Sequence, residues 1–260
     1  PAGSFAYWQA WVFMGILFIP FIIVVSYLLK HDPSLLERRM RFKEKEAREK
    51  SLIKIVQLLF FIGFLLVTQQ VLMRGWIYHF DHWIESRKHH TFRGISSHIL
   101  LALDDMGLRW FTATVLLIAA AFIGWRFKSF RPFNLSVLAL LALNGVVGAC
   151  KLIIGRTKPR LYVDALHANG MSYPSGHASN AIISWGLLAY LIYRYSNRYP
   201  FVGIKLYPLA WVITLTVCVV SLIRKTHWFS DLLGGVFIGA ALLVMVIAID
   251  RFIPSKRQPS

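Results

Sequence analysis

Long apolar stretches separated by short charged segments form the main pattern of this sequence. Several stretches reach about 18 residues or more, the length that a helix needs to cross the hydrocarbon core of a bilayer. They predict seven helices, at residues 5–29, 53–73, 108–125, 133–154, 177–194, 206–224 and 231–250. The pattern therefore predicts an all-α fold, a polytopic bundle of transmembrane helices.

Two connecting segments are long enough to have structure of their own. Residues 30–54 are highly charged, and we expect them to be helical and cytoplasmic. Residues 74–107 suit an amphipathic stretch in the membrane interface, because they contain the aromatic residues Trp76, Tyr78, Trp83 and Phe92. We therefore divide the chain into an accessory N-terminal span with its basic segment, 1–52, and a six-span domain, 53–260.

The composition supports a membrane protein. Hydrophobic residues make up 57% of the chain and charged residues 16%, whereas a soluble domain has about 25% charged residues. The net charge of +17 could indicate nucleic-acid binding, but the charges lie in short loops between spans. Anionic lipid headgroups explain them better, so we expect a bilayer and no nucleic acid as partner. Cys150 and Cys218 lie in apolar runs and indicate no disulfide framework.

The distribution of Lys and Arg predicts the orientation. If residues 30–54 are inside, the inside segments contain 18 Lys and Arg and the outside segments contain 11. The positive-inside rule then places the N-terminus outside and the C-terminus inside. We expect an integral protein of a bacterial cytoplasmic membrane. Residues 151–160 fall on the extracytoplasmic side, where a cationic cluster needs another explanation than cytoplasmic anchoring.

The segment YPSGHASN, at 173–180, has the pattern of a helix start. Ser175 is a favoured N-cap, Gly176 lets a ligand approach the backbone, and His177 lies in the first turn. The free N–H groups and positive dipole end of such a start can bind an anion. The alternative is a capped helix with an interfacial histidine.

The segment HWFSD places His227 and Asp231 four residues apart, on one face of a helix. A carboxylate that accepts the Nδ1 proton leaves Nε2 available as a nucleophile or base. The alternative is an ion pair that only helps to place the span.

The segment KLIIGRTKPR, at 151–160, adds cations at the same face. Lys151, Lys158 and Arg160 suit the oxygens of a phosphate, although headgroup anchoring is an alternative. Arg156 has no role assigned to it beyond facing headgroups.

Metal binding has little support in the sequence. His177, His227 and Asp231 could bind zinc, but the surrounding cations favour a polyanion. We therefore expect neither a metal nor a cofactor. The remaining histidines of the interfacial segment show no ligand pattern: His79, His82, His89, His90 and His98.

Three motifs occur in a characteristic order: Lys-x6-Lys-Pro at 151–159, Pro-Ser-Gly-His at 174–177 and His-x3-Asp at 227–231. Together they resemble the type-2 phosphatidic acid phosphatase, or lipid phosphate phosphatase, superfamily over about residues 53–252. The resemblance implies a helical core and metal-independent hydrolysis of phosphate esters or anhydrides on lipids.

The resemblance also implies roles for single residues. His227 would be the nucleophile that forms a phosphohistidine, Asp231 would orient it, and His177 would protonate the leaving oxygen. The residues implied to hold the phosphate are Lys151, Lys158, Ser175 and Gly176.

The sequence departs from the family pattern at two positions. Lys158 and Ser221 stand where the family usually has Arg. Arg224 or Arg160 is our candidate for the missing cation.

Three functions remain open at this point. The first is a lipid phosphatase acting on a polyprenyl diphosphate, phosphatidic acid, phosphatidylglycerol phosphate or a lipid A phosphate, with the polyprenyl substrate preferred. The second is a lipid phosphotransferase that uses the same phosphohistidine, and the third is a non-catalytic lipid-phosphate-binding protein. Residues 5–66 weakly resemble the N-terminal hairpin of isoprenylcysteine carboxyl methyltransferase-like proteins, which implies an accessory or fused segment.

Overall fold

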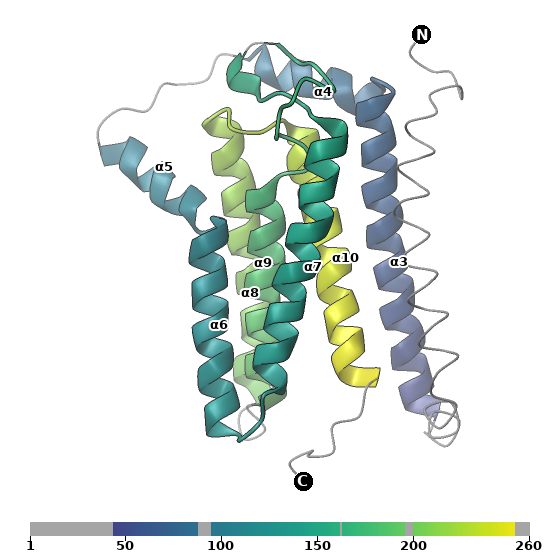
Figure 1. The fold of residues 1–260 in the computed structure, drawn as a ribbon, viewed down its shortest axis with the longest axis vertical. Helices are drawn as coiled ribbons and strands as arrows, with labels where there is room; N and C mark the ends of the chain where they lie inside the picture. Colours follow the sequence, from purple (N-terminus) through teal and green to yellow (C-terminus); the bar gives the residue numbers. More distant parts are fainter. Residues whose placement is uncertain (1–43, 88–94, 162, 196–199, 253–260) are drawn as a thin grey trace.

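The computed structural model describes residues 44–87, 95–161, 163–195 and 200–252, and all regular structure in these ranges is helical (Figure 1). The all-α fold is therefore confirmed. The elements are α3 Glu44–Leu72, α4 Trp76–Glu85, α5 Ile95–Asp105, α6 Arg109–Arg126, α7 Arg131–Ile154, the short 3-10 helix η1 Pro159–Leu161, α8 Gly176–Tyr195, α9 Pro200–Ile223 and α10 Phe229–Phe252.

Within the described residues the predicted helices correspond to the observed ones, and the largest difference in bounds is in α3. This helix begins at Glu44, nine residues before the predicted start at 53, and runs through residue 52, where we placed the boundary between the two parts of the chain. The predicted helix 5–29, Phe92, His89 and His90 lie outside the described residues. The interfacial segment forms the two short helices α4 and α5.

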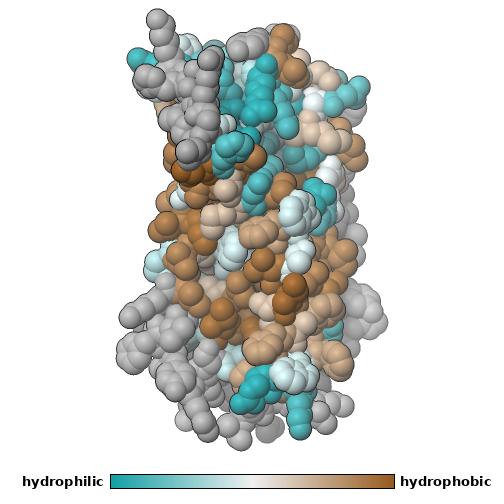
Figure 2. Space-filling model, turned by 90° about the vertical axis from the view of Figure 1, so that its left-hand side faces the viewer, coloured by the Kyte–Doolittle hydropathy of each residue, from teal (hydrophilic) through white to brown (hydrophobic). Residues whose placement is uncertain are grey.

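Four described helices are each long and apolar enough to cross a membrane: α3, α7, α9 and α10. Helices α5 and α6 meet this standard only as a pair bent by 51°, which raises the number to five. Figure 2 shows an apolar band between two more polar ends. The chain is therefore an integral membrane protein.

Helix α8 corresponds to the expected span 177–194, and it does not reach this apolarity. It has 20 residues, enough to cross, but its first half contains Ser179, Asn180 and Ser184, all of which are buried. Because it packs between other helices, α8 exposes little surface to lipid and can tolerate polar residues. Among the described residues, α8 thus adds one more helix of spanning length to the four or five apolar spans.

Successive long helices run in opposite directions (Figure 1). The loop between α7 and α8, the loop between α9 and α10, and helix α4 therefore lie at the same end of the bundle. All three sequence motifs are in these loops or at the adjoining helix ends. We call this end the motif end.

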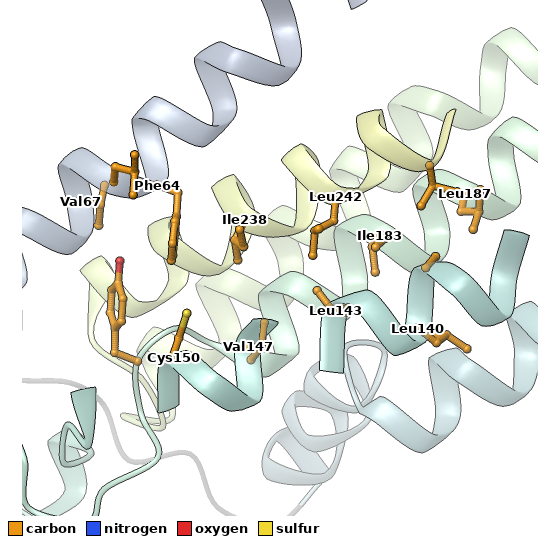
Figure 3. Close-up of a cluster of buried hydrophobic side chains, with 14 of the residues drawn as sticks. Phe64, Val67, Leu140, Leu143, Val147, Cys150, Ile183, Leu187, Ile238 and Leu242 are labelled. Atoms are coloured by element: carbon orange, nitrogen blue, oxygen red, sulfur yellow. The ribbon is translucent and has the colours of Figure 1, made fainter. Parts of the chain in front are cut away.

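The core lies where α3, α7, α8 and α10 meet. Figure 3 shows Ile238 and Leu242 of α10 beside side chains from the other three helices. The labelled neighbours are Phe64 and Val67 of α3, Leu140, Leu143, Val147 and Cys150 of α7, and Ile183 and Leu187 of α8. This contact holds the motif-bearing ends of α7, α8 and α10 in a fixed relation.

Glycines let α10 approach α8 closely. A Cβ atom on Gly239 would lie 2.5 Å from Ile182 Cγ2 and 2.9 Å from the Ser179 carbonyl oxygen. A Cβ atom on Gly235 would lie 2.6 Å from the Ser175 carbonyl oxygen. Small residues allow such close crossings in membrane helices, and here the crossing reaches the motif end.

The opposite end of the bundle is held by a buried carboxylate. Asp250 of α10 accepts a hydrogen bond of 2.6 Å from the Tyr190 hydroxyl of α8 and another from Arg131 Nε of α7. Because Asp250 is buried, these donors replace its hydration. The same three helices are thereby joined at both ends.

The substitution Gly239→Ala tests the close crossing. We expect it to destabilise the protein by about 1–3 kcal/mol, because the added methyl group forces α8 and α10 apart. The matched control is Gly145→Ala in α7, where a Cβ atom would have no neighbour within 4 Å. Thermal unfolding in detergent measures both. A Gly239→Ala midpoint equal to or above that of the control would contradict the crossing.

Candidate functional site

The chain makes a left-handed turn within the first motif, at the end of α7. Gly155, with φ of 55° and ψ of 33°, ends α7, and glycine accepts this conformation without strain. The turn directs Arg156 back beneath the loop, while Lys151 stays in the last turn of α7. Backbone bonds from Ala168 and Gly170 to the Gly155 carbonyl, each 3.0 Å long, fix the loop.

His227 and Asp231 lie together, as their spacing predicts. His227 Nδ1 is 3.5 Å from Asp231 Oδ2, and both residues are buried. Asp231 Oδ2 also accepts hydrogen bonds from the Trp228 amide, at 3.1 Å, and from the Ser172 hydroxyl. The carboxylate is therefore held on the Nδ1 side of the imidazole ring.

The second motif is joined directly to the third. The Ser175 amide donates a 2.8 Å hydrogen bond to the Asp231 carbonyl oxygen. Ser175 Oγ accepts a 3.3 Å bond from the Ala178 amide, so it caps α8 as the sequence predicts. His177, half-buried, has its ring centroid 6.1 Å from that of His227. The two histidines thus face a common space at the motif end.

A buried tyrosine fixes the approach to the second motif. The Tyr173 hydroxyl lies 2.7 Å from the Thr68 hydroxyl of α3, and the Tyr173 ring stacks on Phe64 with centroids 6.3 Å apart. Gly234 of α10 lies against the same ring, since a Cβ atom there would be 2.6 Å from the hydroxyl oxygen. Helix α3 therefore supports the loop that carries Ser175 and leads into α8, where His177 lies.

Two lysines of the first motif lie near His177. Lys151 donates from Nζ to the Met171 carbonyl, and its Cε lies 3.9 Å from the position of a Cβ atom on Gly176. Lys158 is exposed and lies within electrostatic range of both His177 and Lys151. The positive start of α8 and these two ammonium groups create an anion-attracting region.

The two candidate substitutes for the family Arg are also at the motif end. Arg160 donates from Nε and Nη2 to the Arg224 carbonyl, at 3.1 and 3.0 Å. Arg224 Nη1 donates to Asp104 Oδ2 at 2.7 Å, and Ser221 Oγ donates to Asp104 Oδ1 at 2.7 Å. Ser221, where the family has Arg, therefore shares a carboxylate of α5 with Arg224.

Arg156 is the functional-site residue that the sequence does not reveal. Instead of facing headgroups, it is fully buried and forms ion pairs with Asp81, Asp164 and Asp231. These acids come from α4, the loop after η1, and α10. Nothing in their spacing indicates that they meet. The only sequence signal is Asp81 itself, an acid within the aromatic stretch of α4.

The environment of Asp81 is unusual for a carboxylate. Burial raises the pKa of Asp81, while Arg156 and the Ser230 hydroxyl oppose that shift. His82, the next residue, lies with Nε2 3.4 Å from Asp164 Oδ2, so one of the unassigned histidines joins the edge of this cluster. Among the described residues, no group of three or more His, Cys, Asp or Glu side chains is arranged to hold a metal ion.

Residues 132–253 match the family model of the PAP2 superfamily, and this range includes all three motifs. The part of the chain that carries the three motifs is therefore similar to the PAP2 superfamily.

A curated relative is phosphatidylglycerophosphatase B of Bacillus subtilis (strain 168). It is 30% identical over 108 residues, which are 40% of this chain and 51% of the relative. The match thus spans about half of that relative's length. The region that matches the PAP2 family model, residues 132–253, contains Lys151, His177 and His227.

A solved structure has a similar helical fold. The crystal structure of the transmembrane PAP2 type phosphatidylglycerolphosphate phosphatase from Bacillus subtilis superposes with a TM-score of 0.64 and 20% sequence identity. The similarity covers 78% of this chain and 99% of that chain. At this identity the likeness supports the helical arrangement only.

The contact between Tyr173 and Thr68 can be measured by a double-mutant cycle. We expect Tyr173→Phe and Thr68→Val each to lower the free energy of unfolding by about 1 kcal/mol, with a coupling energy of about 0.5–1.5 kcal/mol. Thr68→Val leaves the buried Tyr173 hydroxyl without its partner, whereas Tyr173→Phe leaves the Thr68 hydroxyl bonded only to the Phe64 carbonyl oxygen. Denaturant titration in detergent gives these values. Tyr193→Phe, on an exposed tyrosine, serves as the control, and additive effects would show that the two hydroxyl groups do not interact.

Proposed function

We propose that this chain is an integral-membrane lipid phosphatase that removes a phosphate monoester or cleaves a diphosphate through a phosphohistidine at His227, without a metal ion. The observation that carries the proposal is the buried His227–Asp231 pair, with His177 opposite and Lys151 and Lys158 nearby.

The first chemical step uses the two histidines in opposite roles. Asp231 lies on the Nδ1 side of His227, so Nε2 is the atom available to attack phosphorus. As the new N–P bond forms, the bond between phosphorus and the lipid oxygen breaks. Protonated His177 gives its proton to that oxygen, which leaves as the lipid alcohol.

The second step releases the phosphate. His177, now neutral, takes a proton from a water molecule whose oxygen attacks phosphorus. The N–P bond breaks, its electron pair returns to His227 Nε2, and inorganic phosphate departs. Covalent catalysis divides one difficult displacement into two easier ones.

The cations and the α8 N-terminus supply the phosphate site. A phosphoryl group in transfer carries negative charge on its equatorial oxygens, and fixed positive groups stabilise it. Lys151, Lys158 and the Gly176 amide are placed for this role, with Arg160 and Arg224 at the edge. Ser175 contributes by capping the helix that presents the amide.

A lipid is the expected substrate because the site lies at one end of the membrane bundle, at the depth of headgroups. The curated relative is named phosphatidylglycerophosphatase B, and the similar solved structure is that of a phosphatidylglycerolphosphate phosphatase, both from Bacillus subtilis. Phosphatidylglycerol phosphate is therefore the first substrate to test. Polyprenyl diphosphate, phosphatidic acid and a lipid A phosphate complete the panel. We place the site on the extracytoplasmic side of a bacterial cytoplasmic membrane, following the distribution of Lys and Arg.

The central test is phosphate release from this lipid panel in detergent with EDTA present. We expect release by the wild type and a loss of at least about 10³-fold in His227→Ala, because the nucleophile is gone. His79→Ala, on an exposed histidine of α4, is the control and should keep full activity.

Three outcomes would contradict the proposal. Activity that depends on a divalent metal would rule out the histidine mechanism. Labelled phosphate that ends in a new ester instead of free phosphate would indicate a phosphotransferase. Lipid-phosphate binding without release would indicate a non-catalytic protein.

The substitute for the family Arg is tested by Arg224→Ala and Arg160→Ala. We expect Arg224→Ala to lower kcat/KM by about 10- to 100-fold, the loss of one charge-assisted hydrogen bond to phosphate. Arg160→Ala should have a smaller effect, since its guanidinium donates to a backbone carbonyl. Steady-state kinetics in mixed micelles measure both, and full activity in Arg224→Ala would exclude it as the substitute.

A further inference from the structure

Arg156 is fully buried at the motif end, and every part of its guanidinium is used. Nη1 donates to Asp231 Oδ1 at 3.0 Å and to Ser230 Oγ at 2.7 Å. Nε and Nη2 donate to the two oxygens of Asp164, at 2.9 and 2.7 Å. Nη2 also donates to Asp81 Oδ2 at 2.8 Å. A buried charge with this many fixed partners has only one available orientation.

The two oxygens of the Asp231 carboxylate have different partners. Oδ1 accepts from Arg156, whereas Oδ2 accepts from Ser172 and the Trp228 amide and faces His227 Nδ1. Rotation of the carboxylate would break the bond to Arg156. The guanidinium therefore fixes which oxygen faces the imidazole ring, and at what angle.

Arg156 is itself held from the opposite side by helix α4. Asp81 accepts from Arg156, from the Ser230 amide at 2.8 Å and from the Ser230 hydroxyl. The guanidinium carbon also lies over the rings of Tyr78 and Trp228, 5.7 and 5.0 Å from their centroids. A residue of α4 thus holds the start of α10 and Arg156 together.

We propose that Arg156 and Asp81 are positioning residues that set the orientation and the effective charge of Asp231 behind His227. The inference rests on the proposed function, since it assigns these residues a task in the same reaction. As His227 attacks phosphorus, its ring gains positive charge, which Asp231 stabilises. Arg156 reduces the negative charge of Asp231, and Asp81 in turn compensates Arg156.

This role predicts opposite effects of two neutralising substitutions. Arg156→Gln removes a positive charge behind Asp231, so the His227 ring should hold a proton more firmly. Asp81→Asn removes a negative charge from the same cluster, so the ring should lose its proton more readily. If Arg156 only stabilised the fold, both substitutions would lower activity and stability, and they would not shift the pH dependence in opposite directions.

Other charged and polar groups also face the two histidines, and they are the same in the wild type and in the variants. Asp231 of α10, His177 of α8 and the Ser172 hydroxyl contact or face His227. Asp104 of α5, together with Lys158 and Lys151 of the first motif, lies within electrostatic range of His177. Only the charge of the Arg156 cluster differs between the variants.

The experiment is the pH dependence of kcat/KM for phosphate release in the wild type, Arg156→Gln, Arg156→Lys and Asp81→Asn. We expect the acid limb to move up by about one pH unit in Arg156→Gln and down by up to about one unit in Asp81→Asn, the lower end of shifts caused by a nearby charge. Arg156→Lys keeps the positive charge but loses the planar guanidinium that donates to several acceptors at once. It should therefore lower kcat by about tenfold or more, with little shift of the acid limb of the pH profile.

The matched control is Glu85→Gln. Glu85 is also an acid of α4 and pairs with Lys225 at 2.6 Å, but both side chains are partly exposed. Solvent screens this pair, so the acid limb should move by less than about 0.3 units. Shifts of equal sign in Arg156→Gln and Asp81→Asn, or no shift in either, would overturn the proposal.

A second readout separates this inference from the proposed function. In protein labelled with ¹⁵N-histidine, the His227 signal is assigned by its loss in His227→Gln and titrated in each variant. If the wild type releases no phosphate, the proposed function fails, yet opposite shifts of this titration would still support the positioning role. If phosphate is released and the titrations coincide, the function stands and the positioning role is wrong.

Discussion

The buried guanidinium of Arg156 is the constraint on which the motif end depends. A positive charge removed from water is stable only when fixed acceptors replace its hydration. Its acceptors come from α4, from the loop before the second motif and from α10, so these three segments must meet around it. The interfacial helix α4 is therefore part of the site and not only a membrane-surface element.

The helical bundle makes this meeting possible. Antiparallel helices place the connections of α7 with α8 and of α9 with α10 at one end (Figure 1). Glycines at 235 and 239 let α10 and α8 approach until the Ser175 amide bonds to the Asp231 carbonyl. At the opposite end Asp250 joins α7, α8 and α10, so the relation of the three motif-bearing helices is fixed twice.

Charge is distributed unevenly across the site, in a way that suits the proposed phosphoryl transfer. Carboxylates gather behind His227, where Asp231 is backed by Arg156 and Asp81. Lysines gather around His177 and the start of α8. In the proposed reaction, the nucleophilic imidazole needs negative charge behind its ring, whereas the phosphate oxygens need positive charge around them. The two needs are met on different sides of one pair of histidines.

Much of this protein can be predicted from its sequence, because the signals are local. Apolar length predicts the membrane helices, and the spacing of His227 and Asp231 predicts that they share a helical face. The N-cap at Ser175 is likewise a property of neighbouring residues. Helix α8 is less apolar than an isolated span because its burial depends on α9 and α10, which lie elsewhere in the sequence.

The three motifs can be recognised from the sequence alone, and so can the cluster of positive charge at and after the end of α7, which includes Lys151 and Lys158. Only the tertiary structure decided which cation of residues 151–160 is buried, and it is Arg156. Its partners Asp81, Asp164 and Asp231 are separated by long stretches of chain, and no local periodicity relates them. The left-handed turn at Gly155 and the docking of α4 bring them together, because a buried arginine must find its counter-charges in space rather than in sequence.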